Sequence, residues 1–409
     1  MLIRCMILEG DRVILHGKNP ILTKPLQKKH KTDLPRGYIL HESIIGQKAR
    51  CRVQAHKGTD YRVTHPTFDE YVSMTPRLVT PIYSPDAELI VSLLDIHVAP
   101  PAEGDDLPPL EILESGTGHG SLTLHLSRAI QAANPSPPAI PPTSQIKYLQ
   151  GRPHRPDEQK DQKDQKDQKD EQPQNSDTPN AAAEKETATP SSDPVQEQWD
   201  AWRSQRRAVI HTVDVSPSFS ARAEKTVRGF RRGLYAGNVD FYVGHAENWI
   251  AEQIWQRTPE SLLQLTKPTV EPFLTHAILD MPSANQRIPH VAPILKPNGI
   301  LAVFMPSITQ IGECVDLIRK QNLPFSMDRV VELGAGISGG RQWDVRFAVK
   351  KSRADPASWT ADDAVAVPTP PEEAPRDDGV LVCRPKVGAR IVGGGFVGIW
   401  RRFEDKQKP

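Results

Sequence analysis

A glycine-rich turn between an apolar strand and a helix is the feature that most constrains how this chain folds. Residues 110–121 read LEILESGTGHGS, and the glycines of the turn are Gly116, Gly118 and Gly120. From Leu122 onward, apolar residues recur at helical spacing. Glycine allows positive φ and a close approach of the backbone to a ligand, and a helix N-terminus favours negative groups. The pattern predicts a ligand-binding turn in an α/β fold; the alternative is a tight loop that binds nothing.

The spacing of these glycines distinguishes two classes of cofactor. Dinucleotide-binding enzymes use G-x-G-x-x-G, in which the third glycine comes one residue later. The G-x-G-x-G spacing found here, preceded by the acidic residue Glu114, is more typical of the turn that binds S-adenosylmethionine. The sequence therefore favours an S-adenosylmethionine site over a dinucleotide site.

Strands and helices alternate after residue 85, which is typical of a mostly parallel sheet with helices on both faces. We therefore expect a doubly wound, Rossmann-like α/β sheet. The expected strands are 110–114, 208–215, 239–243, 277–280, 299–305, 328–333, 343–349 and 396–401. The expected helices are 87–94, 121–130, 286–294 and 308–320, with a further helix of basic face after residue 215.

The N-terminal part of the chain has a different pattern. Turn residues separate short strands there, which predicts a small β domain over residues 1–70. These strands are 11–16, 49–55 and 61–64. The α/β domain is assigned to residues 71–132, 205–351 and 381–403.

Two further segments lack the apolar residues that a folded core needs. Only 37% of the chain is hydrophobic, and it contains 39 prolines. Residues 133–204 include four consecutive Gln-Lys-Asp triplets and show no apolar periodicity, so we expect a disordered insertion. An extended charged helix or a regulatory tail is the alternative. Residues 352–380 are expected to form an acidic, proline-rich linker.

Two aspartates lie at the carboxyl edge of the expected sheet, where doubly wound folds bind their ligands. Asp214 ends the strand after the insertion and can accept hydrogen bonds from both hydroxyls of a ribose. Asp280 ends the fourth sheet strand, and Pro282 and Ser283 break the chain directly afterwards, which places Asp280 at the rim of the crevice. The alternatives are a surface carboxylate for Asp214 and a turn-forming residue for Asp280.

Composition limits the other possibilities. The formal net charge is +1, so an RNA-binding surface would have to be a local basic patch. The four cysteines form no C-x-x-C pair, so neither a metal site nor a disulfide framework is expected; they are Cys5, Cys51, Cys314 and Cys383. This suits a reducing compartment. No apolar run reaches the ~20 residues that a membrane helix needs, so no membrane partner is expected.

Five segments, in the same order, resemble the tRNA adenine-58 N1-methyltransferases of bacteria, archaea and eukaryotes. They read HPTFDEY (65–71), TPIYSPDA (80–87), LESGTGHGSLT (113–123), ILDMP (278–282) and PSITQ (306–310). The resemblance covers about residues 1–130 and 205–350, with the last strand near 392–402. No single segment is specific to the family, but the combination is.

The resemblance implies a class I S-adenosylmethionine-dependent methyltransferase that methylates N1 of adenine 58 in the T-loop of tRNA. It implies that the small β domain helps to hold the tRNA. Asp280 matches the family's acid beside the methyl donor and the target adenine, so it is the expected catalytic residue. The expected cofactor-binding residues are Ile82, Tyr83, Ser84, Glu114, Ser115, Gly116, Thr117, Gly118, His119, Gly120, Ser121, Asp214, His245, Ala246, Glu247 and Asp280. The expected RNA-binding residues are Arg77, Met281, Pro282, Pro306, Ser307 and Gln310.

The chain departs from the family's pattern at several positions. His119 replaces the usual serine of the glycine turn, and Phe219 stands where cytosolic relatives often carry an arginine. His245 and Ala246 stand where many relatives place an acidic residue near the adenine of the cofactor. Glu247, one position later, is expected to take the place of that acidic residue.

The resemblance also concerns assembly and location. The family acts on tRNA and works as tetramers. The expected partners are therefore tRNA and either three further copies of this chain or a non-catalytic sister subunit. Segment 80–96 is closer to the bacterial type, whereas the low-complexity insertion is typical of eukaryotes, and a mitochondrial or nuclear enzyme is expected. Two other functions stay open: a class I methyltransferase with a protein or small-molecule substrate, and a non-catalytic RNA-binding subunit of a methyltransferase complex.

Overall fold

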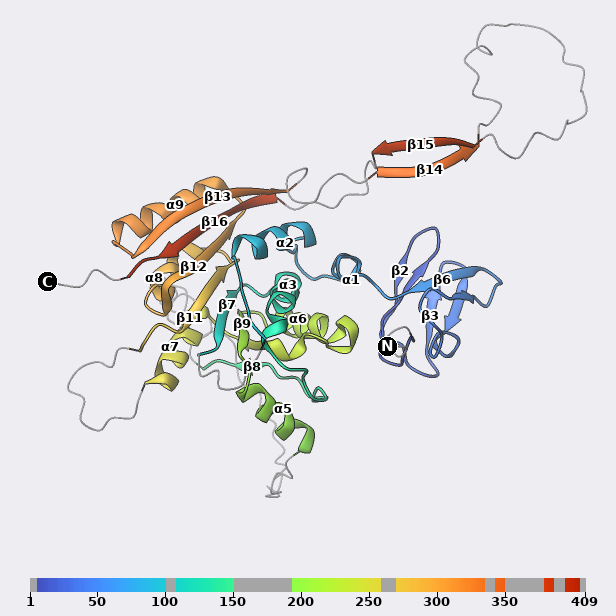
Figure 1. Cartoon of the computed structure of the whole chain (residues 1–409), viewed down its shortest axis with the longest axis horizontal. Helices are drawn as coiled ribbons and strands as arrows, with labels where there is room; N and C mark the ends of the chain where they lie inside the picture. The colour runs from blue at the N-terminus through green and yellow to red at the C-terminus, as the bar shows by residue number, and fades with distance from the viewer. Residues whose placement is uncertain are drawn as a thin grey trace, which may run out of the picture.

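An eight-stranded sheet forms the framework of the larger of two domains (Figure 1). The computed structural model describes residues 6–100, 108–150, 193–258, 270–334, 343–349, 379–385 and 394–404. The strands lie in the order β13 (Phe325–Gly334), β16 (Gly394–Arg402), β12 (Leu295–Met305), β11 (Leu274–Leu279), β7 (Leu110–Ser115), β9 (Ala208–Asp214), β10 (Val239–Val243) and β8 (Lys147–Tyr148). The strands from β12 to β8 are parallel, and β16 is antiparallel to β12 and β13. The mostly parallel α/β sheet expected from the sequence is confirmed.

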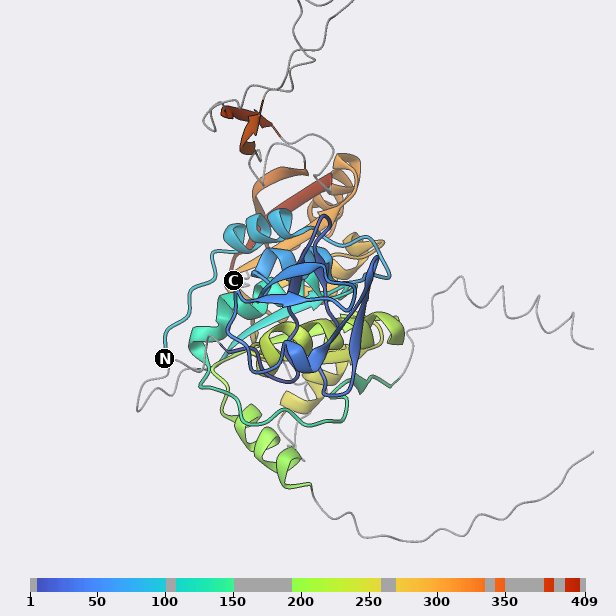
Figure 2. The same ribbon diagram turned by 90° about the vertical axis from the view of Figure 1, so that its right-hand side faces the viewer.

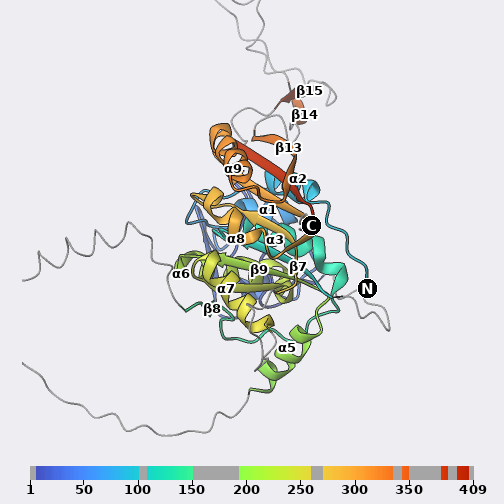
Figure 3. The same ribbon diagram turned by 90° about the vertical axis from the view of Figure 1, so that its left-hand side faces the viewer.

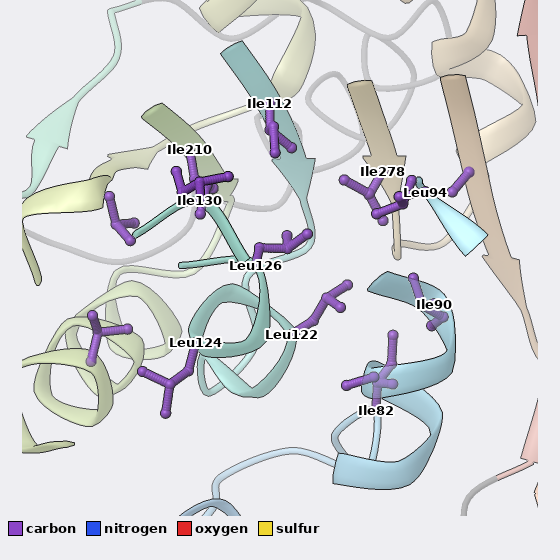
Figure 4. Close-up of a cluster of buried hydrophobic side chains, with 14 of the residues drawn as sticks. Ile82, Ile90, Leu94, Ile112, Leu122, Leu124, Leu126, Ile130, Ile210 and Ile278 are labelled. Carbon is purple, nitrogen blue, oxygen red and sulfur yellow. The ribbon is translucent and has the colours of Figure 1, made fainter. Parts of the chain in front are cut away.

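Helices cover both faces of this sheet. Successive residues of a strand point to opposite faces, so the apolar side chains of a central strand pack against helices on both sides. On one face, α2 (Ser84–Leu93), α3 (Ser121–Ile130) and α6 (Pro217–Gly229) pack on a cluster that includes Ile112 and Ile278 (Figure 4). The other face carries α7 (Ala246–Arg257), α8 (Ile288–Val291) and α9 (Ile308–Lys320) (Figure 3). These helices pack on a second cluster that includes Leu113 and Leu279, the residues next to Ile112 and Ile278 in the strands. Each central strand is therefore buried on both sides.

Two expectations for the C-terminal half of this domain are corrected. The helix expected over 286–294 is a 3-10 turn, η6 (Ala284–Arg287), followed by the single turn of α8, and Pro293 prevents its continuation. The strand expected over 343–349 is present as β14 (Trp343–Val349), but it pairs with β15 (Gly379–Pro385) in a separate hairpin that stands away from the large sheet (Figure 1). Because β15 begins at residue 379, the linker expected over 352–380 is too long by two residues, and its remainder lies outside the described residues.

The N-terminal domain is antiparallel and has its own core. Its four-stranded sheet has the order β2 (Ile21–Leu22), β1 (Ile14–His16), β6 (Asp60–Thr64) and β5 (Arg52–Gln54). A second hairpin joins β3 (Lys31–Leu34) to β4 (Gly37–Leu40) and leads into η2 (His41–Ser43). Leu15, Leu26 and Val63 are fully buried between these elements. Figure 2 views the molecule from the side of this domain, which lies in front of the α/β domain.

Helix α1 (Phe68–Met74) connects the two domains. A capping box between Thr67 and Glu70 fixes its first turn. The hydroxyl of Tyr71, which is fully buried, donates to the carbonyl oxygen of Thr226 in α6 at 2.8 Å. This contact ties α1, and through it the β domain, to the α/β domain.

The expectation that residues 133–204 are disordered is wrong at both ends of that segment. Residues 134–150 run along the α/β domain and contain β8 near their end, and α5 (Pro194–Ser204) precedes β9. In α5, Trp199 is buried and stacks on Trp202, and Arg203 donates to the buried carboxylate of Asp240 at 2.7 Å. The average composition of the insertion concealed the two tryptophans at helical spacing. Its middle, residues 151–192, lies outside the described residues.

Candidate functional site

A cavity of about 620 Å³ opens at the carboxyl edge of the sheet, between the ends of β7, β9, β11 and β12. Its volume lies within the range of about 300–1,000 Å³ that is usual for small-molecule sites. The expected site residues that line it are Ile82, Ser115, Gly116, Thr117, Gly118, His119, Ser121, Asp214, Ala246, Asp280, Met281, Pro282, Pro306 and Gln310. The cavity therefore brings together residues expected to bind the cofactor and residues expected to bind RNA.

The other expected site residues lie outside the lining of this cavity: Arg77, Tyr83, Ser84, Glu114, Gly120, His245, Glu247 and Ser307. Sequence reasoning in turn missed several lining residues: Val79, Thr80, Pro81, Leu122, Val213, Val215, Gly244, Phe304 and Met305. Phe219, noted as a departure from the family, also lines the cavity. Most of the missed residues adjoin an expected one in sequence, which is the signal that could have found them.

The glycine turn is packed against the backbone of the neighbouring strands. Gly116 has φ +99°, and a Cβ atom added to it would lie 1.8 Å from the carbonyl oxygen of Asp280. The backbone N–H of Asp280 donates to the carbonyl of Ser115 at 2.8 Å, and that of Gly116 donates to Val213 at 2.9 Å. The turn thus holds the ends of β7, β9 and β11 together, and only glycine fits at position 116.

Asp214 presents both carboxylate oxygens at the cavity. Oδ2 accepts a hydrogen bond from the backbone N–H of Gly118 at 3.0 Å, and Oδ1 accepts one from that of Ser216 at 2.9 Å. Burial raises the pKa of Asp214, and these two hydrogen bonds oppose the rise. Each oxygen of an ionised carboxylate has a further lone pair, so Asp214 can accept two hydroxyl groups of a ligand.

Asp280 carries a carboxylate that no described residue satisfies. It follows β11 directly, and its side chain makes no hydrogen bond or ion pair with the described part of the chain. Burial raises the pKa of Asp280 to about 7, and the carboxylate of Asp214 adds to the rise. A desolvated carboxylate that lines a cavity without a partner is suited to act on a ligand.

Glu114 lies beneath the glycine turn and is sealed from the cavity. The hydroxyls of Thr123 and Thr212 donate to its Oε2 at 2.6 and 2.7 Å. Burial raises the pKa of Glu114 to about 8, against the effect of these hydrogen bonds. Glu114 is therefore mostly protonated at neutral pH. It fastens the turn to β9 and α3 from behind, rather than facing the cavity as a cofactor ligand would.

His119 is the residue of the turn that departs most from the family's pattern. Its side chain is 2% exposed, lines the cavity and makes no hydrogen bond with a described residue. Burial lowers the pKa of His119 to about 4, and the cationic groups of Arg77 and Arg222 lower it further. The imidazole is therefore neutral, and it adds one donor and one acceptor to the cavity without adding charge.

The structure does not bring Glu247 into the cavity as a partner for an adenine. Its carboxylate forms an ion pair with Arg287 at 2.9 Å, and Arg287 is buried. His245 caps the N-terminus of α7 through its backbone, and only Ala246 of this segment lines the cavity. The buried guanidinium of Arg287 requires a counter-charge, and Glu247 provides it.

Four other expected residues support the walls of the cavity from outside. The hydroxyl of Ser84 lies 3.1 Å from Nε2 of His125, which anchors the start of α2. Ser307 caps α9 and donates its backbone N–H to the side chain of Gln310 at 3.2 Å. The guanidinium of Arg77 donates to the hydroxyl of Tyr83 at 3.1 Å and lies over its ring.

Within the described ranges, no cluster of three or more His, Cys, Asp or Glu side chains is arranged to hold a metal ion. Among the helices of these same ranges, none has the length and apolar character required to cross a membrane.

Comparison with known proteins supports the interpretation of this site. No known family model matches the chain. The chain is 23% identical over 326 residues to the tRNA (adenine(58)-N(1))-methyltransferase TrmI of Thermus thermophilus. This alignment covers 80% of this chain and 84% of that protein. It is 25% identical over 124 residues to the tRNA (adenine(58)-N(1))-methyltransferase catalytic subunit TRM61 of Candida albicans, which covers 30% of this chain and 34% of that protein. The resemblance expected from the sequence is confirmed.

A solved structure supports the assignment of the fold. A SAM-dependent O-methyltransferase from Thermotoga maritima matches 99% of this chain and 98% of its own, with a TM-score of 0.53 and 12% sequence identity. This likeness shows that the α/β domain has the fold of class I S-adenosylmethionine-dependent methyltransferases.

Proposed function

We propose that this protein transfers the methyl group of S-adenosyl-L-methionine to N1 of adenine 58 in tRNA. The observation that carries the proposal is the unpartnered carboxylate of Asp280, which lines one cavity together with the glycine turn and with Pro306 and Gln310. The similarity to tRNA (adenine(58)-N(1))-methyltransferases extends over 80% of the chain and supports the same substrate.

The residues present fit this cofactor. Asp214 offers two carboxylate oxygens, which matches the two hydroxyls of a ribose. The carboxylates of Asp214 and Asp280 make the cavity negative, which favours a cationic ligand. Ile82, Leu122 and Phe219 supply apolar surface for a purine ring. When bound, S-adenosyl-L-methionine supplies an electrophilic methyl group on a sulfonium cation.

Asp280 acts on the target base. N1 of adenine is a weak, neutral nucleophile, and its methylation produces a cationic base. An ionised carboxylate beside the exocyclic amine orients the ring and stabilises the charge that develops in the transition state. Asp280 can also accept a proton from that amine after the transfer. The remaining contribution of the protein is to align the reacting atoms.

The target adenine has to leave the RNA stack to reach this cavity. Met281 and Pro282 follow Asp280 directly, and Pro306 and Gln310 lie on the adjoining wall. These four residues are proposed to contact the extruded base and its neighbours. Arg77 and Ser307 lie outside the lining and are proposed to contact the RNA backbone.

The test is methyl transfer from labelled S-adenosyl-L-methionine to unmodified tRNA by the purified chain, with the modified base mapped by mass spectrometry. N1-methyladenine at position 58, absent when that adenine is replaced, is the expected result. If only a protein or a small molecule were methylated, and no tRNA, the protein would be a class I methyltransferase with another substrate. Cofactor binding without transfer would favour the need for a sister subunit, and a chain that binds no cofactor would be a non-catalytic subunit.

The variant Asp214→Asn is expected to bind the cofactor about 10–100-fold more weakly, because hydrogen bonds to a charged group contribute about 1.5–3 kcal/mol. The amide offers one acceptor oxygen where the carboxylate offers two, and its NH₂ group opposes the backbone N–H that it faces. Isothermal titration calorimetry with S-adenosyl-L-methionine measures the effect. Asp316→Asn, which removes an exposed carboxylate of α9, is the control. An unchanged affinity of Asp214→Asn would contradict the assigned role.

The reaction is expected to become faster as the pH rises through about 7. Asp280 has a raised pKa of about 7, so it is protonated and inactive at lower pH and ionised at higher pH. The pH profile of kcat/KM for the cofactor reports the free enzyme and should bend near pH 7. The profile of kcat should bend at lower pH, because a bound cation lowers the pKa of a neighbouring carboxyl. A flat kcat/KM profile between about pH 5 and 9 would contradict this prediction.

A tetramer, formed by four copies or together with a sister subunit, is proposed as the assembly on the basis of the family resemblance, and light scattering on the purified chain tests it. A mitochondrial or nuclear location also stays a proposal, which fluorescence microscopy of the tagged protein tests.

A further inference from the structure

Two consecutive arginines adopt the left-handed backbone conformation where α6 meets the β domain. Arg231 has φ +44° and ψ +49°, and Arg232 has φ +56°; both lie in the 3-10 turn η4 (Phe230–Arg232) that follows α6. Gly233 continues the left-handed path with φ +80°. A non-glycine residue is strained in this conformation, because its Cβ atom lies too close to the following carbonyl oxygen, so two in succession require support from their surroundings.

The surroundings hold this turn from both sides. Phe230 is buried and stacks on Tyr235, with ring centroids 5.6 Å apart. A Cβ atom added to Gly233 would lie 2.1 Å from Cδ1 of Ile140. The guanidinium of Arg232 forms an ion pair with Asp11 of the β domain at 3.1 Å. The turn is therefore a fixed part of the junction between the two domains.

Arg231 is held here without a counter-ion. Its side chain is exposed, its guanidinium lies 5.7 Å from the ring centroid of Phe230, and it forms no ion pair with any residue that the structure describes. Asp11, an acidic residue in contact with this turn, is paired with Arg232. The guanidinium of Arg12 lies nearby over the ring of Tyr71, so the junction carries excess positive charge.

The other basic residue near the end of α6 differs from Arg231. The guanidinium of Arg228 donates to the carbonyl oxygens of Pro141 and Thr143, each at 2.7 Å, and to the carboxylate of Glu224. Its hydrogen bonds thus tie the first arm of the insertion to α6. Arg231 keeps its donors free for a ligand.

We propose that the Arg231–Arg232 turn is a phosphate-binding element that grips the tRNA backbone at the domain junction, with Arg231 as its free donor. The inference rests on the proposed function and specifies where the RNA is held. Helix α6 begins beside the cavity at Pro217 and ends at Gly229, which separates the turn from Asp214 by about 20 Å at 1.5 Å per residue. A polynucleotide can reach both places at once, whereas the small cofactor cannot.

The variant Arg231→Gly separates this role from a structural one. Glycine adopts the left-handed conformation without a Cβ penalty, and this gain offsets the larger entropy of glycine in the unfolded chain, so the variant should melt within about 2 °C of the wild type. It should nevertheless bind tRNA about three- to tenfold more weakly, and the slope of log K against log salt should fall by about one. Arg231→Lys, which keeps the charge, should recover most of the affinity, and Arg319→Ala, which removes an exposed cation from α9, should have no effect.

The measurements are tRNA binding at several salt concentrations, thermal unfolding, and cofactor binding by calorimetry. Weaker tRNA binding of Arg231→Gly with unchanged cofactor affinity and a melting temperature close to that of the wild type is the expected result. A tRNA affinity within about twofold of the wild type, in a folded variant, would overturn the inference but leave the proposed function intact. Wild-type protein that methylates no tRNA and binds none would overturn both.

Discussion

Replacing Asp280 by asparagine is expected to lower kcat for methyl transfer to tRNA by about 10²–10³-fold, the usual effect of removing one group that stabilises charge in a transition state. The carboxylate of Asp280 lines the cavity and has no partner in the described chain, so its loss removes an interaction that forms only with the substrate. Cofactor affinity should change by less than about tenfold, because Asp214 is unchanged. Single-turnover transfer at saturating cofactor measures the effect.

The control for this experiment is Asp316→Asn on the surface of α9, which removes one carboxylate far from the chemistry and should transfer at the wild-type rate. Asp280→Asn should also lose the bend near pH 7 in the profile of kcat/KM for the cofactor. If kcat of Asp280→Asn stayed within about tenfold of the wild type, Asp280 would have no role in the transition state.

Replacing Gly116 by alanine is expected to destabilise the protein by about 2–5 kcal/mol, which combines the penalty for a Cβ at positive φ with the cost of overpacking. The added Cβ atom would lie 1.8 Å from the carbonyl oxygen of Asp280, which is backbone and cannot rotate away. Either the turn or the end of β11 has to move, so cofactor binding should be lost as well. Urea unfolding and calorimetry measure the two effects.

Gly118→Ala provides a matched control within the same turn. Gly118 has φ +56°, which non-glycine residues can adopt at a cost of about 1 kcal/mol, and the nearest atom to an added Cβ is Cγ1 of Val79 at 3.6 Å. This variant should fold, and it should unfold at a slightly lower urea concentration than the wild type. Equal losses of stability in Gly116→Ala and Gly118→Ala would show that contact with Asp280 is not what requires glycine at position 116.

The central part of the candidate site could be predicted from sequence because the fold brings the ends of parallel strands to one edge. The glycine turn follows β7, Asp214 ends β9 and Asp280 follows β11, and these strands are neighbours in the sheet. Because the chain alternates strands and helices, the sequence alone predicts that these residues meet at the carboxyl edge of the sheet. The long insertion between α3 and β9 did not alter this, because it leaves the order of the strands unchanged.

The roles that could not be predicted depend on partners that are distant in the sequence. Glu247 is adjacent to the cavity in sequence, but Arg287, forty positions later, takes up its carboxylate. Glu114 precedes the glycine turn, but hydroxyls from two other elements enclose it. The neutral state of His119 arises from burial and from two arginines on separate segments. Helix α5 was not predicted because the average composition of the insertion hides a stacked pair of tryptophans, of which Trp199 is buried.

The position of β16 between β12 and β13 determines when the α/β domain can be completed during synthesis. β16 occupies residues 394–402, yet it supplies the hydrogen-bonding partner of both neighbouring strands, and Phe396 pairs with Met305 at the wall of the cavity. Until the ribosome has released this segment, β12 has an unpaired edge and β13 has no strand to join. A nascent chain would expose these edges to aggregation until residues 394–402 have been synthesised. A chain that terminates before residue 394 lacks the whole of β16, so its α/β domain should fail to form a complete core, and such a product should depend on chaperones or be degraded.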